Sequence, residues 1–142
     1  MHISNKCSIA VHCLIFIHEF GESHKVTSDL LAMSSGCNPA VIRKILSALK
    51  KDRMISVKFG TGGAQLCCPP EEITLYRVCM CVDPDMLEKL FGVHQNPSPL
   101  CPVGKNINTV LSKSYDPIRL GLADSLKSVT LQDILEIYHD QI

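Results

Sequence analysis

The sequence lacks the patterns that mark the commonest metal, redox and catalytic sites. It contains eight cysteines but no C-x-x-C pair, which removes the usual zinc and dithiol motifs. It has no H-E-x-x-H and no Ser/His/Asp spacing of a hydrolase, and the glycines of GTGGA are not followed by the Lys-Ser/Thr of a phosphate loop. We therefore expect neither an enzyme nor a bound metal.

Long apolar runs are absent as well. No stretch approaches the ~18 apolar residues of a membrane span. The stretch IAVHCLIFI resembles the apolar part of a signal peptide, but His12 interrupts it, and His18 and Glu19 follow without a small-residue cleavage site. These observations predict a cytoplasmic protein with no membrane partner.

The net charge is zero, yet the two halves of the chain differ. Residues 1–65 hold eight Lys/Arg and four Asp/Glu, whereas residues 66–142 hold six and ten. A basic N-terminal half favours a polyanion partner there, with a chance distribution as the alternative. A chain of 142 residues can fold without disulfides, so we interpret most of the cysteines, Cys7 and Cys13 among them, as small core residues.

The N-terminal half predicts a helix-turn-helix followed by a hairpin. Residues 5–20 form a helix with two apolar stripes, which suggests burial on both sides, one of them near a partner chain. VTSDLLAMS is a short helix capped by Thr27, and NPAVIRKILSALKKDR is a second helix capped by Asn38, with a basic stripe opposite its apolar one. A basic second helix is typical of DNA recognition. MISVKFGTGGAQLCC then predicts a β-hairpin, the wing of a winged helix.

The C-terminal half predicts further helices around a proline-rich segment. Thr74 caps the helix LYRVCMCV, and apolar positions keep helical spacing from Asn106 to residue 129, where Pro117 should kink or split the helix. TLQDILEIYHDQI is a last helix, with Thr130 and Asp133 placed as a capping box. We divide the chain into a winged helix-turn-helix domain with the N-terminal helix (1–83), a proline-rich regulatory loop (84–105), and a dimerisation helix with the C-terminal helix (106–142).

These motifs, in this order, resemble the Rrf2 (BadM-type) family of bacterial winged-helix transcription regulators. The matching stretches are SNKCSIAVHCLIFI, NPAVIRKILSALKKDRMI, GTGGAQL, EEITLYRVCMCVD and TLQDIL, which span nearly the whole chain. The resemblance implies a mainly α fold with a small β-hairpin: a winged helix-turn-helix plus a long dimerisation helix. It also implies a homodimer on a palindromic operator in double-stranded DNA. Many members of the family sense redox state, nitric oxide or iron–sulfur supply.

Two features depart from the family pattern. The family's wing usually reads R-G-x-G-G-G-Y, and here Phe59, Ala64 and Gln65 replace the arginine, a glycine and the tyrosine. The chain therefore lacks the wing arginine that would contact the minor groove, although Lys58 lies one residue back. Cluster-binding members carry three cysteines before the dimerisation helix, where this chain has only Cys101.

The basic stripe of the second helix supplies the expected DNA contacts. Arg43 can hold guanine O6 and N7, Lys44 and Ser47 can reach bases or phosphates, and Ala40 leaves room for close approach. The helix start at Asn38 can hold a phosphate through backbone N–H groups. Further backbone contacts are expected from Lys50, Lys51, Arg53 and Lys58, and from the wing residues Thr61, Gly62 and Gly63.

The segment HQNPSPLCPVG holds one thiol, Cys101, among three prolines. An exposed thiolate is sufficient to sense oxidants, and Cys37 is the second candidate because it directly precedes the cap of the recognition helix. An inert thiol in a packed loop is the equal alternative. His94 and Cys101 are at most two cluster ligands, so no cofactor is expected, and an iron–sulfur cluster is possible but not favoured.

Taken together, the sequence predicts a sequence-specific DNA-binding regulator, a homodimeric repressor with a thiol-redox response. The alternatives are an iron–sulfur or metal-responsive regulator, and an interaction module without DNA binding, which only the altered wing supports.

Overall fold

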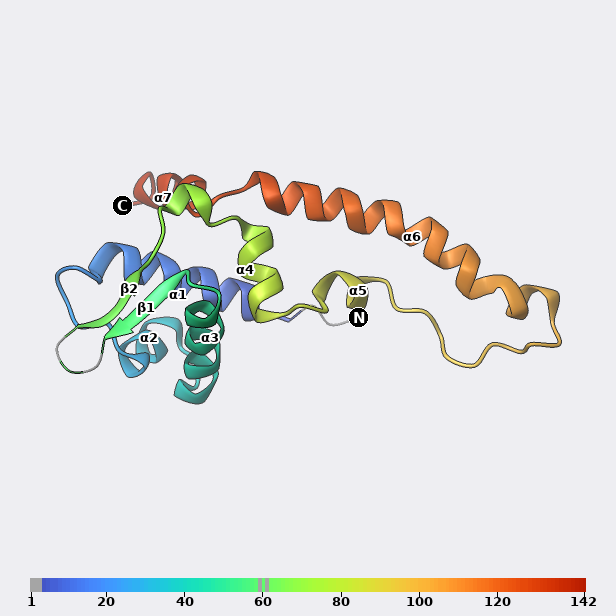
Figure 1. The fold of residues 1–142 in the computed structure, drawn as a ribbon, viewed down its shortest axis with the longest axis horizontal. Helices are drawn as coiled ribbons and strands as arrows, with labels where there is room; N and C mark the ends of the chain where they lie inside the picture. Colours follow the sequence, from blue (N-terminus) through green and yellow to red (C-terminus); the bar gives the residue numbers. More distant parts are fainter. Residues whose placement is uncertain (1–3, 59, 61) are drawn as a thin grey trace.

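The computed structural model describes residues 4–58, 60 and 62–142. A head of short helices and one hairpin carries a long helical arm (Figure 1). In chain order the elements are α1 (Lys6–Phe20), α2 (Ser28–Ser35), α3 (Pro39–Lys51), β1 (Ile55–Lys58), β2 (Gly63–Leu66), the 3-10 turn η1 (Pro70–Glu72), α4 (Leu75–Val82), α5 (Met86–Leu90), α6 (Pro102–Ser128) and α7 (Leu131–His139). The mainly helical fold with one small antiparallel hairpin, expected from the sequence, is confirmed.

The helices of the head begin at the caps that the sequence predicts. Thr27, Asn38 and Thr74 accept hydrogen bonds from backbone N–H groups at the starts of α2, α3 and α4, at 3.2, 2.8 and 3.1 Å. Thr130 and Asp133 form the expected capping box at the start of α7. Local side-chain chemistry therefore sets these boundaries.

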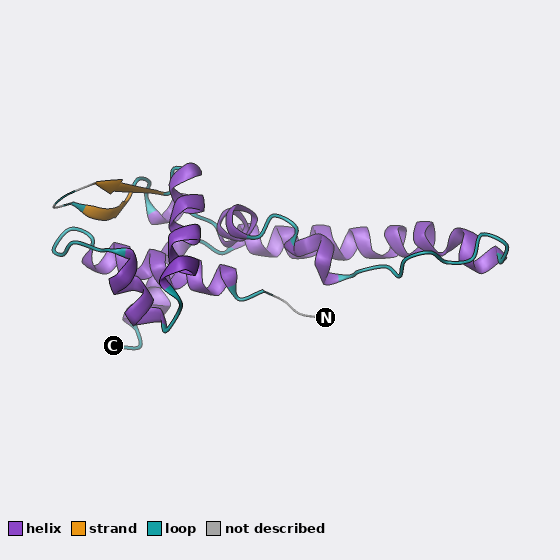
Figure 2. Ribbon diagram, turned by 90° about the horizontal axis from the view of Figure 1, so that it is seen from below, coloured by secondary structure: helices purple, strands orange, loops and turns teal. Residues whose placement is uncertain are grey.

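The core of the head is built from α1, α2, α3, the hairpin, α4 and α7. The fully buried side chains with less than 2% exposure include Leu14, Leu31, Ile42, Leu49, Met54 and Leu135. The two strands lie at the end of the molecule opposite the far end of α6 (Figure 2). Their register pairs Ile55 with Leu66 and Lys58 with Gly63.

The last helix belongs to this core, although the sequence grouped it with the long helix. Leu131 and Leu135 are buried in the same cluster as the α1 side chains. The chain enters α7 through a strand-like bridge, in which Leu131 N–H donates to the Ile73 carbonyl at 2.7 Å. The arm therefore leaves the head at α5 and returns to it at α7, so both of its ends are anchored.

The arm consists of the proline-rich segment, which leads away from the head, and α6, which returns to it (Figure 1). α6 begins at Pro102, earlier than the residue 106 expected, because Pro102 takes the first helical position. Of the two effects expected of Pro117, a kink or a split, the split does not occur, since α6 continues to Ser128. Both Pro117 and Lys113, whose carbonyl loses its intrahelical donor, are exposed, so water can satisfy that carbonyl.

One side chain fastens the start of the arm. The Arg119 guanidinium on α6 donates to the backbone carbonyls of Leu87 at 3.3 Å and Phe91 at 2.8 Å. The Phe91 ring stacks on Tyr115 with centroids 5.0 Å apart. These contacts hold α5 against α6 and direct the proline segment outward.

Candidate nucleic-acid interface

The recognition helix α3 divides into one buried and one exposed face. Ile42, Ile45, Leu46 and Leu49 are buried in the head. The predicted contact residues on α3 are all exposed, namely Ala40, Arg43, Lys44, Ser47, Lys50 and Lys51. Because α3 is amphipathic at helical spacing, burial of the aliphatic stripe leaves the cationic one facing outward.

A groove of about 460 Å³ lies between α3, the segment before α2 and the hairpin. Arg43, Ser47 and Lys50 line it from α3, and Lys58 lines it from β1. Lys25, which the sequence analysis did not select, lines it as well. Several cations around one groove make a polyanion-binding surface. Lys25 was missed because it precedes α2 and belongs to no helical stripe.

The start of α3 differs from the expected phosphate site. Pro39 has no N–H, Ala40 N–H donates to the Asn38 side chain at 2.8 Å, and Val41 N–H donates to the Asn38 carbonyl at 3.0 Å. A phosphate would have to displace these bonds. Asn38 is therefore placed as a cap that positions α3.

The wing residues fall into three cases. Gly63 is buried at φ +68°, and a Cβ there would lie 2.6 Å from the Val26 nitrogen, so Gly63 permits close packing of the hairpin against Val26 while it also lines the groove beside α3. Gly62 is half-buried against the Lys58 side chain. Thr61, like Phe59, lies outside the described residues. Gln65 donates to the Gly21 carbonyl at 3.3 Å, so this replacement of the family's tyrosine ties the hairpin to α1.

The two thiols predicted as sensors occupy different environments. Cys37 is half-buried against the core, and its thiol donates to the Ser35 carbonyl at 3.6 Å. Cys101 is exposed at the N-cap of α6, which lies at the far end of the arm from the α2–α3 turn (Figure 1). The backbone N–H groups of Gly104 and Val103 hold the pKa of Cys101 below its ordinary value, because they stabilise the thiolate.

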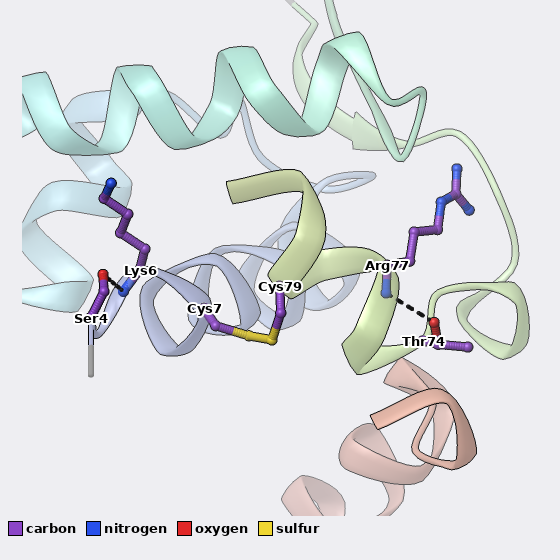
Figure 3. The surroundings of a disulfide bond; sticks show 6 residues. All are labelled: Ser4, Lys6, Cys7, Thr74, Arg77 and Cys79. Carbon is purple, nitrogen blue, oxygen red and sulfur yellow. Dashed lines mark hydrogen bonds between the residues drawn. A yellow bond between two sulfur atoms is a disulfide. The ribbon is translucent and has the colours of Figure 1, made fainter. Parts of the chain in front are cut away.

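The remaining thiols include one feature that the sequence did not predict. Cys13 is a buried core thiol, as expected, and burial raises its pKa to about 12. Cys7, predicted to be a core residue, packs against the core and in addition forms a disulfide with Cys79, with the two Cα atoms 5.0 Å apart (Figure 3). No local sequence pattern predicts this bond, because 72 residues separate the two cysteines.

Comparison with known proteins identifies this architecture. A model of the Rrf2 family, described as an iron-dependent transcriptional regulator, matches residues 3–137. The chain belongs to the Rrf2 family of transcriptional regulators. YwnA of Bacillus subtilis (strain 168), which is named an HTH-type transcriptional regulator, is 34% identical over 133 residues, covering 94% of this chain and 96% of YwnA. This Rrf2 protein is therefore a DNA-binding regulator and not an enzyme.

Solved structures agree with that assignment. One, described as a DNA-binding protein, is 28% identical with a TM-score of 0.74, and the match covers 92% of this chain and 98% of that one. The oxidized form of CymR from Staphylococcus aureus is 16% identical with a TM-score of 0.68, covering 94% of this chain and 95% of that one, and shares the fold. None of the helices in the described ranges is long and apolar enough to cross a membrane.

The family description names iron, and the donor set among the residues that the structure describes does not fit it. Within residues 4–58, 60 and 62–142, no three His, Cys, Asp or Glu side chains are grouped to hold a metal ion. Cys101 is the only cysteine between α5 and α6. An iron–sulfur cluster is held by four ligands, mostly thiolates, which one protomer does not bring together here.

Proposed function

We propose that this Rrf2 regulator is a homodimeric, sequence-specific repressor that reads a palindromic operator and responds to thiol oxidation. The observation that carries the proposal is the exposed cationic face of α3, which opens onto a groove with further lysines around it. Because its partner is chromosomal DNA, we place the protein in the cytoplasm.

The reading of bases is assigned to the middle of α3. The Arg43 guanidinium can donate two parallel hydrogen bonds to guanine O6 and N7 in the major groove. Lys44 and Ser47 lie beside it on the exposed face and can reach bases or phosphates. Lys51, Lys58 and Lys25 are assigned to phosphates, which fix the position of α3 without reading sequence.

The exposed surface of α6 supports the homodimer. Among its 27 residues only Ala123 is buried, while Val103, Val110, Ile118 and Leu120 are 50–69% exposed. A long helix with so much uncovered apolar surface gains stability when a second copy covers it. A two-fold dimer then presents two α3 helices to two half-sites about one helical turn apart.

The exposure and lowered pKa of Cys101 support the redox response. We assign to its thiolate the attack on a peroxide oxygen, which gives a sulfenic acid and releases the other oxygen as water after protonation. An oxidized form of CymR, which shares the fold, exists as a solved structure. Cys37 lies at the other end of the molecule, so a Cys37–Cys101 bond would have to join two protomers or follow a movement of α3.

Selection of duplexes from a random pool, followed by affinity measurement with Arg43→Ala and Lys51→Ala, tests the proposal. Arg43→Ala should weaken binding to the selected duplex by about 1–3 kcal/mol and relax one base position per half-site. Lys51→Ala should weaken selected and random duplexes alike and lower the slope of log affinity against log salt by about 1. A reporter gene behind the selected site should be repressed by the wild type.

Two results would count against the proposal. Equal loss of base preference in both variants would contradict the division between base and phosphate contacts. Failure of the wild type to bind any duplex at 50 mM salt would favour an interaction module, the alternative that the altered wing supports.

A further inference from the structure

The Cys7–Cys79 disulfide links two helices of the head that contact the rest of the molecule differently. Cys7 lies in the first turn of α1 and is half-buried, whereas Cys79 lies on α4 and is 3% exposed (Figure 3). The bond therefore fixes α4 covalently to α1.

The opposite face of α4 holds the end of the recognition helix. The Arg77 guanidinium donates to the Asp52 carboxylate at 2.8 Å and to the Asp52 carbonyl at 2.9 Å, and Asp52 is the C-cap of α3. The Cys81 thiol donates to the Ala48 carbonyl of α3 at 3.0 Å. Residues 77 and 81 share one face of a helix, and residue 79 lies on the other. In Figure 3 the Arg77 side chain accordingly extends away from the disulfide.

The disulfide to α1 thus fixes the position of α4 on one face, and the hydrogen bonds on the opposite face tie the end of α3 to that position. We propose that Cys7 and Cys79 form a reversible dithiol–disulfide switch, which acts through α4 to fix the recognition helix for DNA binding. The inference rests on the proposed function and adds to it a redox site separate from Cys101. DNA-binding regulators work in a reducing compartment, where a disulfide is usually a redox element and seldom a structural one.

The chemistry of the switch is a two-electron exchange with a peroxide. The Cys7 thiolate attacks one peroxide oxygen and becomes a sulfenic acid, and the other oxygen leaves as water after protonation. The Cys79 thiol then attacks the Cys7 sulfur, forms the S–S bond and releases a second water. We assign the first attack to Cys7 because it is the more exposed of the pair and lies in the first turn of a helix, where the dipole favours a thiolate. A cellular dithiol returns both electrons and restores two thiols.

The oxidised state is the one in which α3 is held as described above. Reduction removes the covalent link to α1 and leaves α4 held by packing and by its hydrogen bonds to the end of α3. If DNA binds the oxidised protein more tightly than the reduced protein, the redox state of Cys7 and Cys79 is coupled to DNA affinity. By linkage, bound DNA then favours the disulfide by the same factor. We expect reduction to weaken binding to the selected duplex by about 5- to 150-fold, the usual range of such couplings.

The test uses the full chain with Cys101→Ser, so that the other proposed sensor is silent. Hydrogen peroxide, followed by alkylation and peptide mass spectrometry, should show the Cys7 and Cys79 peptides joined, and dithiothreitol should release them. Affinity for the selected duplex should be higher before reduction than after it. Cys7→Ser should abolish this difference, whereas Cys67→Ser, at an exposed free thiol, should retain it.

A second variant and a second readout keep the coupling separate from DNA binding and from folding. Arg77→Ala should still form the disulfide but lose the redox dependence of affinity. Hydrogen exchange at the α3 C-terminus should rise on reduction in the parent and be insensitive to reduction in Arg77→Ala. Unlinked peptides after peroxide, or a linked pair with affinity and exchange unchanged, would overturn the switch. If no redox state binds duplex DNA while exchange still responds, the proposed function fails and the coupling stands.

Discussion

Replacing Leu135 by alanine tests whether α7 is an integral part of the winged-helix core. Leu135 is 1% exposed and packs in the cluster that contains the buried α1 residues. Truncation removes buried carbons and leaves a cavity, which for leucine costs about 2–5 kcal/mol of unfolding free energy. For a chain of this size about 1 kcal/mol corresponds to roughly 3–4 °C, so the melting temperature should fall by about 6–20 °C.

Ile137→Ala supplies the matched control, since Ile137 is an aliphatic residue of the same helix that is 63% exposed. Its free energy of unfolding should stay within about 0.5 kcal/mol of the wild type. Both variants are measured by thermal and urea unfolding at one protein concentration, because the stability of a dimer depends on concentration. Equal small losses in the two variants, or a separate low-temperature transition of α7, would refute its place in the core.

Three further outcomes follow from other parts of the molecule. Alkylation of Cys101 should become fast at a lower pH than alkylation of an ordinary thiol, because its lowered pKa maintains the thiolate there. Cys13, with a pKa of about 12, should stay unlabelled in the folded protein at pH 9. Mass spectrometry of the labelled peptides measures both rates, and equal rates would contradict the assignment. Gly63→Ala should destabilise the head by about 2 kcal/mol or more, because the new Cβ is strained by the positive φ and also meets the Val26 backbone. Gly36→Ala has the same φ but open space around it, so it should cost only about 1–2 kcal/mol in urea unfolding. The reverse order would refute the packing role of Gly63. Leu120→Asp should convert the proposed homodimer to a monomer in light scattering, whereas Asn108→Asp, at another exposed position of α6, should stay dimeric. A dimer in both variants would place the interface elsewhere.

The helices of the head could be predicted from the sequence because their boundaries are encoded locally. Thr27, Asn38 and Thr74 each stand one position before a helix and accept a hydrogen bond from its first turn. The aliphatic stripe of α3 is buried and its basic stripe exposed, as its periodicity required. The family resemblance extended the prediction to the order of the elements.

What the sequence could not provide depends on contacts between distant segments. The Cys7–Cys79 bond joins residues 72 positions apart and follows no periodic pattern. The return of α7 to the head depends on the bridge between residues 74 and 130, which no local rule predicts. At Pro117 a local rule allowed a split helix that does not occur. Proline usually kinks or interrupts a helix because one carbonyl loses its hydrogen bond, but in α6 that carbonyl is exposed and water can bond to it.

The altered wing bears on how the proposed DNA contacts are divided between the hairpin and α3. Gln65 is engaged with the Gly21 carbonyl, and Gly63 is packed against Val26, so these two hairpin residues serve the fold of the head. The cations that remain at the groove beside the hairpin are Lys58 and Lys25. A lysine is a compact point charge without the fork geometry that lets arginine recognise a narrow groove. We therefore propose that the hairpin side contributes attraction to phosphates and that discrimination between sequences rests on Arg43 and its neighbours on α3.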